Sequence, residues 1–240
     1  MGKEVGDHLK ITKEGIAVVE VDNYLSKDIE TMGRLDVAHE ILAPYQQYIP
    51  TGGTVVDVGA CLGDYTATFS RFVGPEGTVY AFEPHTPALE CLIYNMRSYI
   101  NVYIYGVALG SQSGRANVIR DFHNLGASQL RLDPNGIVEI MTLDHIASAW
   151  PPMPLPVMRR LDFLKIDCEG FDPLVLDGGR ETIQRFRPVI LIEISNWMLA
   201  KLNMNMTAED IYSRLEAMDY QFTRTDGHDG DVLCLPKEKV

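Results

Sequence analysis

The 240-residue sequence lacks long hydrophobic runs, closely spaced cysteines and an excess of basic side chains. No apolar stretch reaches the roughly 18 residues of a membrane-spanning helix, and no apolar run follows the polar N-terminus as it does in a signal peptide. The four cysteines form no C-x-x-C pair, which argues against a zinc ligand set and against a disulfide framework. We therefore expect a soluble, cytoplasmic protein with free thiols and no membrane span.

The charge balance is the next constraint. Acidic residues outnumber basic ones by 33 to 21, which gives a formal net charge of −12. Tight binding to a phosphate backbone depends on Lys and Arg side chains that displace counterions, so nucleic acid is disfavoured as a partner. A small-molecule partner is expected instead, and no feature of the sequence predicts an oligomeric state.

Strand and helix patterns alternate along most of the chain. Short apolar runs predict parallel strands at residues 54–58, 78–82, 102–107, 163–167 and 189–194, and a closing antiparallel hairpin at 221–225 and 231–235. Continuous apolar strands that alternate with helices indicate an α/β fold with a mostly parallel, Rossmann-like sheet covered on both faces. The length suits one large domain, 51–240, preceded by a small N-terminal cap, 1–50.

Several local features refine this outline. Residues 11–21 predict a hairpin, and the apolar spacing of 35–48 predicts a helix that Pro44 kinks or shortens. Broken alternating runs within 110–142 predict strands laid beside the main sheet. The helix expected at 173–186 is interrupted at Gly178-Gly179, and Thr207 with Asp210 has the spacing of a capping box.

The loop after the first of these strands distinguishes between nucleoside cofactors. Gly59 and Gly63 allow the backbone to approach a ligand, and Glu83 ends the next strand, where a carboxylate can accept both ribose hydroxyls. The dinucleotide fingerprint requires glycine at positions 61 and 64, which are Cys61 and Asp64. The Asp64 carboxylate would repel a pyrophosphate, but it is a favourable neighbour for the ammonium and sulfonium groups of S-adenosylmethionine (SAM). The loop therefore predicts SAM, with an NAD site or a ligand-free turn as alternatives.

A second charged motif follows the strand 163–167. Asp167 and Glu169 end a buried strand, Lys165 shares its face with Asp167, and Glu193 ends the neighbouring strand. A hydroxyl acceptor is a weak nucleophile that benefits from a base, which makes Asp167 the candidate base or acceptor orienter; it can equally hold the SAM ammonium. A purely structural ion network is the alternative. Three carboxylates suit a divalent metal, but no His or Asn stands nearby in sequence, so we predict no metal.

Four motifs resemble the FkbM-type methyltransferases over roughly residues 52–195. They are D-V-G-A-C-L-G-D-Y-T at 57–66, A-F-E-P-H-T-P at 81–87, L-K-I-D-C-E-G at 164–170 and R-P-V-I-L-I-E at 187–193. The departures are Cys61, where the family usually has Asn, and Cys168, where it usually has Val. The resemblance implies a class I methyltransferase sheet, SAM as methyl donor with S-adenosylhomocysteine (SAH) as product, and O-methylation of a sugar, glycolipid-like or natural-product hydroxyl.

Together these motifs predict two sets of site residues and no metal ligand. The catalytic set is Asp167, Lys165, Glu169 and Glu193. The cofactor-binding set is Asp57, Gly59, Ala60, Cys61, Gly63, Tyr65, Thr66, Glu83, Pro84, Ala108 and Asp167. The alternatives are an RNA 2′-O-methyltransferase, whose sites also carry Lys, Asp and Glu on adjacent strand ends, an NAD-linked oxidoreductase, and a SAM-binding module without activity.

Overall fold

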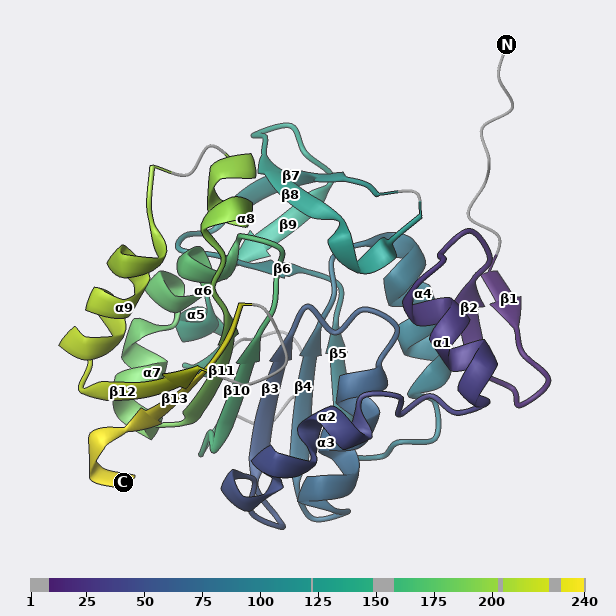
Figure 1. The fold of residues 1–240 in the computed structure, drawn as a ribbon, viewed down its shortest axis with the longest axis horizontal. Helices are drawn as coiled ribbons and strands as arrows, with labels where there is room; N and C mark the ends of the chain where they lie inside the picture. The colour runs from purple at the N-terminus through teal and green to yellow at the C-terminus, as the bar shows by residue number, and fades with distance from the viewer. Residues whose placement is uncertain (1–8, 122, 149–157, 203–204, 225–229, 240) are drawn as a thin grey trace.

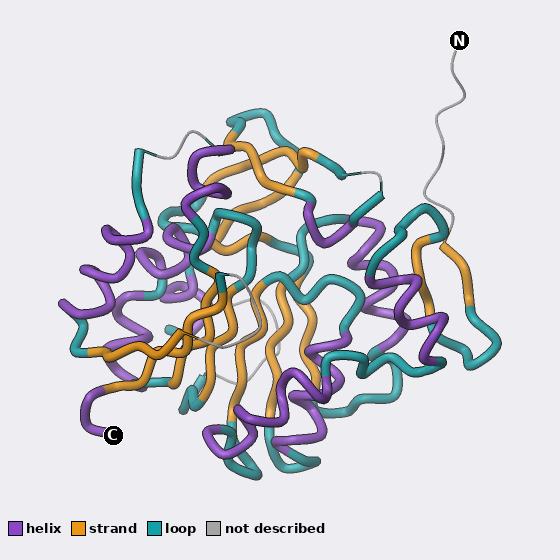
Figure 2. Tube along the Cα trace, viewed as in Figure 1, coloured by secondary structure: helices purple, strands orange, loops and turns teal. Residues whose placement is uncertain are grey.

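The computed structural model describes residues 9–121, 123–148, 158–202, 205–224 and 230–239. A seven-stranded sheet runs through the centre of the molecule, a four-stranded sheet lies above it, and a two-stranded hairpin stands at one side (Figure 1). Helices flank the central sheet, as the secondary-structure colouring makes clear (Figure 2). The expected α/β architecture is therefore confirmed.

The central sheet has the strand order β12-β13-β11-β10-β3-β4-β5. Its strands are β3 (Thr54–Val58), β4 (Thr78–Phe82), β5 (Val102–Tyr105), β10 (Phe163–Ile166), β11 (Val189–Glu193), β12 (Tyr220–Arg224) and β13 (Asp231–Pro236). Strand β13 runs antiparallel to both of its neighbours, whereas β3, β4, β5, β10 and β11 are parallel. The predicted mostly parallel sheet with an antiparallel C-terminal hairpin is confirmed, and this strand order is the one expected of a class I methyltransferase.

Helices pack on both faces of this sheet, which explains why its inner strands are apolar throughout. One face is covered by α2 (His39–Leu42), the 3₁₀ helix η1 (Ala43–Tyr48), α3 (Asp64–Val73) and α4 (Thr86–Asn95). The other face is covered by α5 (Leu143–Ala147), α6 (Asp172–Gly178), α7 (Arg180–Phe186), α8 (Asn196–Lys201) and α9 (Ala208–Ala217). The 3₁₀ helix η3 (Lys237–Lys239) ends the described chain.

The N-terminal segment forms the expected hairpin and one helix that the sequence reading did not predict. The hairpin pairs β1 (Leu9–Ile11) with β2 (Ala17–Val19), and α1 (Leu25–Met32) follows it. The helix expected at 35–48 is shortened, because α2 gives way to η1 directly before Pro44. Pro44 lacks the amide hydrogen that a continuing α-helix requires at this position.

The four-stranded sheet fills the segment between β5 and α5. Its strands are β6 (Ala108–Leu109), β7 (Gly114–Ile119), β8 (Gln129–Leu132) and β9 (Val138–Met141), in the order β6-β9-β7-β8. The 3₁₀ helix η2 (Leu125–Ala127) connects β7 to β8. This sheet lies across the carboxyl ends of the central strands, so it forms a roof over the place where ligands of parallel sheets bind.

Other local predictions also have clear outcomes. The break at Gly178-Gly179 separates α6 from α7, and the capping box of Thr207 and Asp210 opens α9 with both of its hydrogen bonds formed. Helix α8 was not predicted. The proline-rich segment 151–156 lies outside the described residues. Within the described part of the chain, no helix combines the length and the apolar character needed to span a bilayer.

Candidate active site

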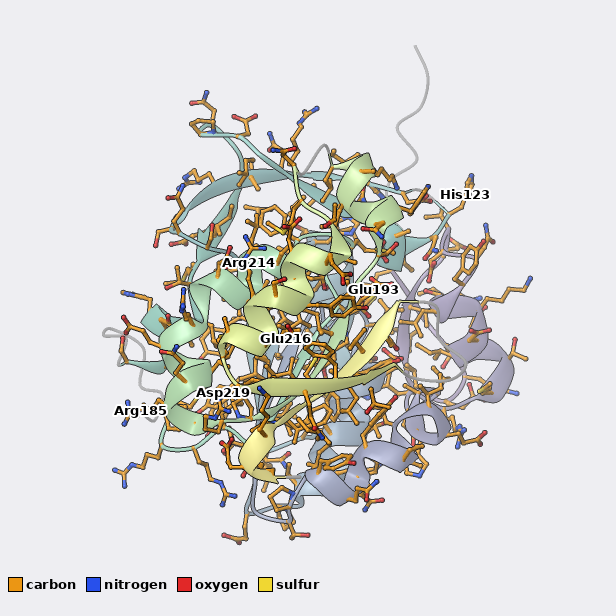
Figure 3. The ribbon with its side chains drawn as sticks, turned by 60° about the vertical axis from the view of Figure 1, so that its left-hand side comes forward. His123, Arg185, Glu193, Arg214, Glu216 and Asp219 are labelled. Atoms are coloured by element: carbon orange, nitrogen blue, oxygen red, sulfur yellow. The ribbon has the colours of Figure 1, made fainter. Side chains whose placement is uncertain are left out.

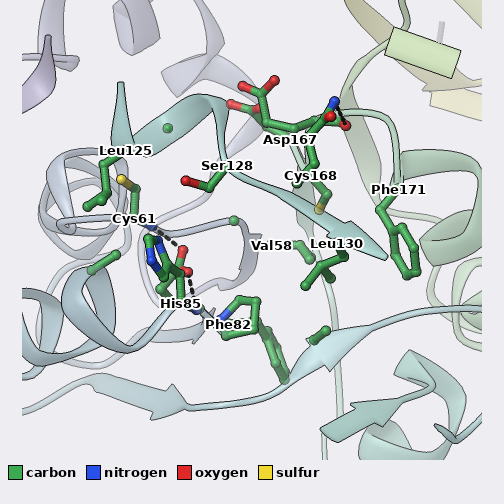
Figure 4. A pocket seen from close by; sticks show the side chains of 18 of the residues that line it. Val58, Cys61, Phe82, His85, Leu125, Ser128, Leu130, Asp167, Cys168 and Phe171 are labelled. Atoms are coloured by element: carbon green, nitrogen blue, oxygen red, sulfur yellow. Dashed lines mark hydrogen bonds between the residues drawn. The ribbon is translucent and has the colours of Figure 1, made fainter. Parts of the chain in front are cut away.

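A cavity of about 200 Å³ lies between the carboxyl ends of the central strands and the roof sheet (Figure 4). Nine of the predicted site residues line it: Gly59, Cys61, Tyr65, Glu83, Pro84, Ala108, Lys165, Asp167 and Glu169. Five others do not line it: Asp57, Ala60, Gly63, Thr66 and Glu193. The motifs from β3, β4, β5 and β10 therefore meet at one place, as expected where parallel strands end together.

Glu83 is fixed at the end of β4 by two backbone amides. The amide of Cys61 donates to its Oε2 at 2.9 Å, and the amide of His85 donates to its Oε1 at 2.7 Å. Burial raises the pKa of Glu83 to about 7, while these two amides act in the opposite direction. Each oxygen accepts one amide and has capacity for a further donor, and Glu83 lines the cavity.

The loop after β3 takes its shape from three residues with positive φ. Gly59 and Gly63 adopt φ values of 80° and 96°, and Cys61 adopts 47° between them. Asn enters this left-handed region more readily than most residues, which gives a physical reason for the Asn of the FkbM-type pattern at position 61. Cys61 nevertheless keeps the backbone geometry that directs its amide to Glu83.

Lys165 connects the loop after β3 with the loop after β10. Its Nζ donates to the carbonyl oxygen of Gly59 at 3.0 Å and lies 3.3 Å from Asp167 Oδ2 and 3.5 Å from Asp57 Oδ1. It also lies 4.8 Å from the centre of the Tyr65 ring. Burial acts to lower the pKa of Lys165, but Asp167 and Asp57 outweigh it and the net pKa is raised well above the usual value. The ammonium is therefore charged, and Gly59, Asp167, Asp57 and Tyr65 hold it at the edge of the cavity.

Asp57 supports this arrangement from behind the cavity. It is completely buried, and its Oδ2 accepts a 2.6 Å hydrogen bond from the Thr66 hydroxyl. Burial raises its pKa, against the opposing effect of Lys165. Since Asp57 and Thr66 do not line the cavity, their geometry suits holding Lys165 and helix α3 rather than touching a ligand. Their assignment to the cofactor set stays a prediction.

Three carboxylates gather where β10 and β11 end. One oxygen each of Asp167, Glu169 and Glu193 lies within 4.8 Å of the others, an arrangement in which a metal ion can be held. Desolvation, with repulsion from Asp167 as the next cause, raises the pKa of Glu169 to about 7 and that of Glu193 to about 9. Glu193 is the last residue of β11, and its side chain is labelled in Figure 3. The metal-free reading stays a prediction.

Two side chains that the sequence reading missed hold the loop after β10. Asp172 accepts from the amides of Cys168 at 3.0 Å and Gly170 at 2.9 Å, and Gln129 donates from the roof sheet to the Glu169 carbonyl at 3.0 Å. Both side chains are buried. The Asp-Pro pair at the start of a predicted helix was a signal for Asp172, because this dipeptide often opens a helix. Nothing in the local sequence marks Gln129.

Comparison with known proteins gives one family match. The family model described as the methyltransferase FkbM domain matches residues 57–222. Among curated proteins, none matches this chain.

Solved structures with detectable likeness include three methyltransferase-related proteins. FkbM from Methylobacillus flagellatus is 19% identical, with a TM-score of 0.47 over 75% of this chain and 42% of its own. Fibrillarin from Aeropyrum pernix, solved with bound SAM, is 12% identical, with a TM-score of 0.48 over 97% of this chain and 84% of fibrillarin. The O-methyltransferase TomG from Streptomyces achromogenes, also solved with SAM, is 13% identical, with a TM-score of 0.48 over 84% of this chain and 78% of TomG. The present chain thus spans less than half of the first of these proteins.

Proposed function

The chain belongs to the FkbM family of SAM-dependent methyltransferases, and from this membership we propose that it transfers the methyl group to a hydroxyl of a small, sugar-like or natural-product acceptor. The observation that carries the proposal is the position of Asp167. Its side chain is 40% exposed and lines the same cavity as the predicted cofactor motifs, and Lys165 Nζ lies 3.3 Å from it. A carboxylate that is both accessible and oriented suits a base for a hydroxyl group.

The residues on the cofactor side fit SAM. Glu83, with both oxygens oriented by backbone amides, suits the two ribose hydroxyls. Gly59 leaves no room for a side chain, because a Cβ there would overlap the carbonyl oxygen of Asp167. Ala108 and Pro84 line the same cavity as Glu83 and offer an apolar surface for a flat base. Asp64, also in the cavity lining, suits the cationic amino-acid end.

The proposed mechanism uses few groups. SAM supplies a methyl group that is already activated by its sulfonium, so the protein's main tasks are positioning and the exclusion of water. Asp167 accepts the proton of the acceptor hydroxyl. Lys165 fixes the direction of that carboxylate and ties it to the Gly59 carbonyl, so that the base keeps a constant position relative to the cofactor loop. Glu169 lines the cavity beside Asp167 as a further hydrogen-bond acceptor for the hydroxyls of the substrate, and an oxygen of Glu193 lies within 4.8 Å of both carboxylates.

Calorimetric titration with SAM, SAH and NAD in parallel tests the cofactor half of the proposal. We expect SAM and SAH to bind at micromolar concentration and NAD not to bind. Glu83→Ala is expected to weaken SAH binding by about tenfold or more, because the ribose hydroxyls lose a buried acceptor. Wild-type protein that binds neither sulfur ligand would overturn the proposal.

The acceptor half requires a screen of hydroxyl-bearing sugars and natural products, with amine- and thiol-bearing compounds beside them, using methyl-labelled SAM. For an acceptor found in this way, Asp167→Asn is expected to lower kcat by about 100-fold or more while the SAH affinity changes little, since a general base contributes on this scale. Unchanged turnover in Asp167→Asn would remove this residue from the mechanism. Methylation confined to amine or thiol acceptors would argue against O-methyl transfer.

A further inference from the structure

The N-terminal arm, defined as residues 9–32, reaches the cavity although it precedes the family match, which begins at residue 57. Leu25 of this arm lines the cavity together with Ala88 of α4 and Leu125 of η2. Figure 4 shows Leu125 at the same end of the cavity as Cys61 and His85. This end contains Glu83, because the amides of Cys61 and His85 are its two donors.

An apolar cluster fastens the arm to this end of the cavity. Ala17 and Ile29 of the arm pack with Leu62 of the β3 loop, Cys91 of α4 and Leu125, and all five are at least 96% buried. The cluster joins four segments that are distant in sequence. The arm is thus packed against both the loop after β3 and the segment that leads into the roof sheet.

Two buried polar side chains fix the arm in register. Asn95 of α4 accepts from the Ala17 amide at 2.7 Å and donates to the carbonyls of Ala17 at 3.0 Å and Leu62 at 2.9 Å. Asp22 is only 5% exposed, and it accepts from the amides of Ser26 at 2.7 Å and Leu125 at 3.1 Å. The first of these contacts starts helix α1, and the second crosses to η2.

A backbone hydrogen bond lies next to the Asp22 bridge, the pair of bonds by which Asp22 links Ser26 of α1 to Leu125 of η2. The amide of Asn23 donates to the carbonyl of His123 at 2.8 Å. Together these bonds hold the segment 123–125 against the arm, so that Leu25 and Leu125 form one continuous wall. A buried carboxylate costs free energy unless its partners are in place, which makes the Asp22 bridge sensitive to any loss of alignment.

We propose that the N-terminal arm is part of the SAM site and that Asp22 is a positioning residue for it, which holds the Leu25–Leu125 wall against the ribonucleoside half of the cofactor. The inference rests on the proposed function, because it takes Glu83 as the ribose acceptor. It assigns to this segment a task in cofactor affinity that the family match does not cover.

The test compares Asp22→Ala with Asp28→Ala, a matched change at an exposed position of α1. The probes are SAH and 5′-methylthioadenosine, which retains the nucleoside and lacks the amino-acid end. Asp22→Ala is expected to weaken the binding of both probes by the same factor, about tenfold. Asp28→Ala is expected to weaken their binding by less than about twofold. Asp22→Asn keeps one acceptor oxygen and is expected to fall between wild type and Asp22→Ala.

Hydrogen–deuterium exchange separates this local role from general destabilisation. In Asp22→Ala, exchange is expected to rise in 19–33 and 123–130 and to stay unchanged in 163–172. Leu25→Ala serves as a second variant if Asp22→Ala fails to fold, and a loss of SAH affinity of about three- to tenfold is expected from the lost apolar contact.

The possible outcomes separate the role of the arm from the proposed function on which it rests. Failure of the wild-type protein to bind SAH would refute the proposed function. Normal SAH binding in wild type, Asp22→Ala and Leu25→Ala alike would overturn the inference and leave the function standing. Equal loss in Asp22→Ala and Asp28→Ala, or exchange that rises throughout the molecule, would also overturn it.

Discussion

The loops after β3 and β10 leave neighbouring strands and meet in the same cavity, yet they are held by different means. The loop after β3 obtains its shape from its own glycines, with Gly59 and Gly63 in the left-handed region. The loop after β10 also carries two residues with positive φ, Glu169 and Gly170, but the amides of Cys168 and Gly170 donate to Asp172 and the Glu169 carbonyl accepts from Gln129 of the roof sheet. The first loop therefore depends mainly on backbone conformation and on backbone bonds to the end of β4, whereas the second depends on two buried side chains, Asp172 and Gln129.

Under the proposed function the two loops serve different partners. The glycine loop would face the cofactor, whose chemistry is the same for every acceptor. The loop after β10 would present its carboxylates to the acceptor, and its link to the roof sheet couples their position to the segment that covers the site. Lys165 joins the two loops through the Gly59 carbonyl and Asp167.

The largest expected effect comes from adding a methyl group to the glycine loop. Gly59→Ala forces a left-handed alanine and an overlap with the carbonyl oxygen of Asp167, so we expect a loss of about 3 kcal/mol or more in unfolding free energy. SAH binding should be lost as well. Urea unfolding and calorimetry measure both quantities.

Gly52→Ala is the matched control, because Gly52 has a φ of 74° and nothing within 4 Å of an added Cβ. It should cost only the backbone strain, about 1–2 kcal/mol. Equal losses of unfolding free energy in the two variants would show that the Asp167 carbonyl does not restrict the side chain at position 59. The loops after β3 and β10 would then be less tightly packed than their geometry indicates.

A smaller and more local effect is expected in the loop after β10. Asp172→Asn leaves one acceptor oxygen for the two amides of Cys168 and Gly170, so at least one of these amides should exchange about tenfold faster. The comparison is best made at pH 8, above the pKa of about 7 to which burial raises Asp172. With an identified acceptor, kcat should fall more than the SAH affinity.

Asp177→Asn on the same helix controls for the chemical change. Asp177 is 39% exposed and pairs with Arg214 at 3.3 Å, away from the loop. Its exchange pattern at Cys168 and Gly170 should match that of wild type. Identical protection in Asp172→Asn would mean that packing alone shapes this loop, and the contrast between the two loops would disappear.

The smallest expected effect concerns pH. Desolvation and the neighbouring carboxylates raise the pKa of Glu193 to about 9, so the folded protein retains a proton there that the unfolded chain loses near pH 4.5. The associated stability is complete below pH 4.5 and declines as the pH rises toward 9. Glu193→Gln should remove this decline and exceed wild type at pH 9 by about 1 kcal/mol or more.

Glu216→Gln provides the control, because Glu216 lies exposed on α9, apart from Glu193 (Figure 3). Its unfolding curves should follow those of wild type from pH 5 to pH 9. A Glu193→Gln variant with the same pH dependence as wild type would show that the carboxylates at the ends of β10 and β11 do not repel one another as their proximity indicates.

Much of the architecture followed from local patterns. The apolar runs located every strand of the central sheet to within a few residues, and Gly178-Gly179 marked the break between α6 and α7. Helices α1 and α8 were missed. Helix α8 has only six residues, too few for a periodic pattern, whereas α1 does carry Leu25, Ile29 and Met32 at helical spacing. The short elements depend on packing more than on their own sequence.

The sequence by itself determined the sheet, the glycine loop and the presence of Glu83 and Asp167 at strand ends, because strand ends and glycine spacing are read from neighbours along the chain. Only the tertiary structure decided what holds these groups. Lys165 reaches the Gly59 carbonyl across 106 residues, and Gln129 reaches Glu169 across 40. Asp22 meets Leu125 across 103. Such contacts arise from the folding of distant segments onto one another, and no local pattern encodes them.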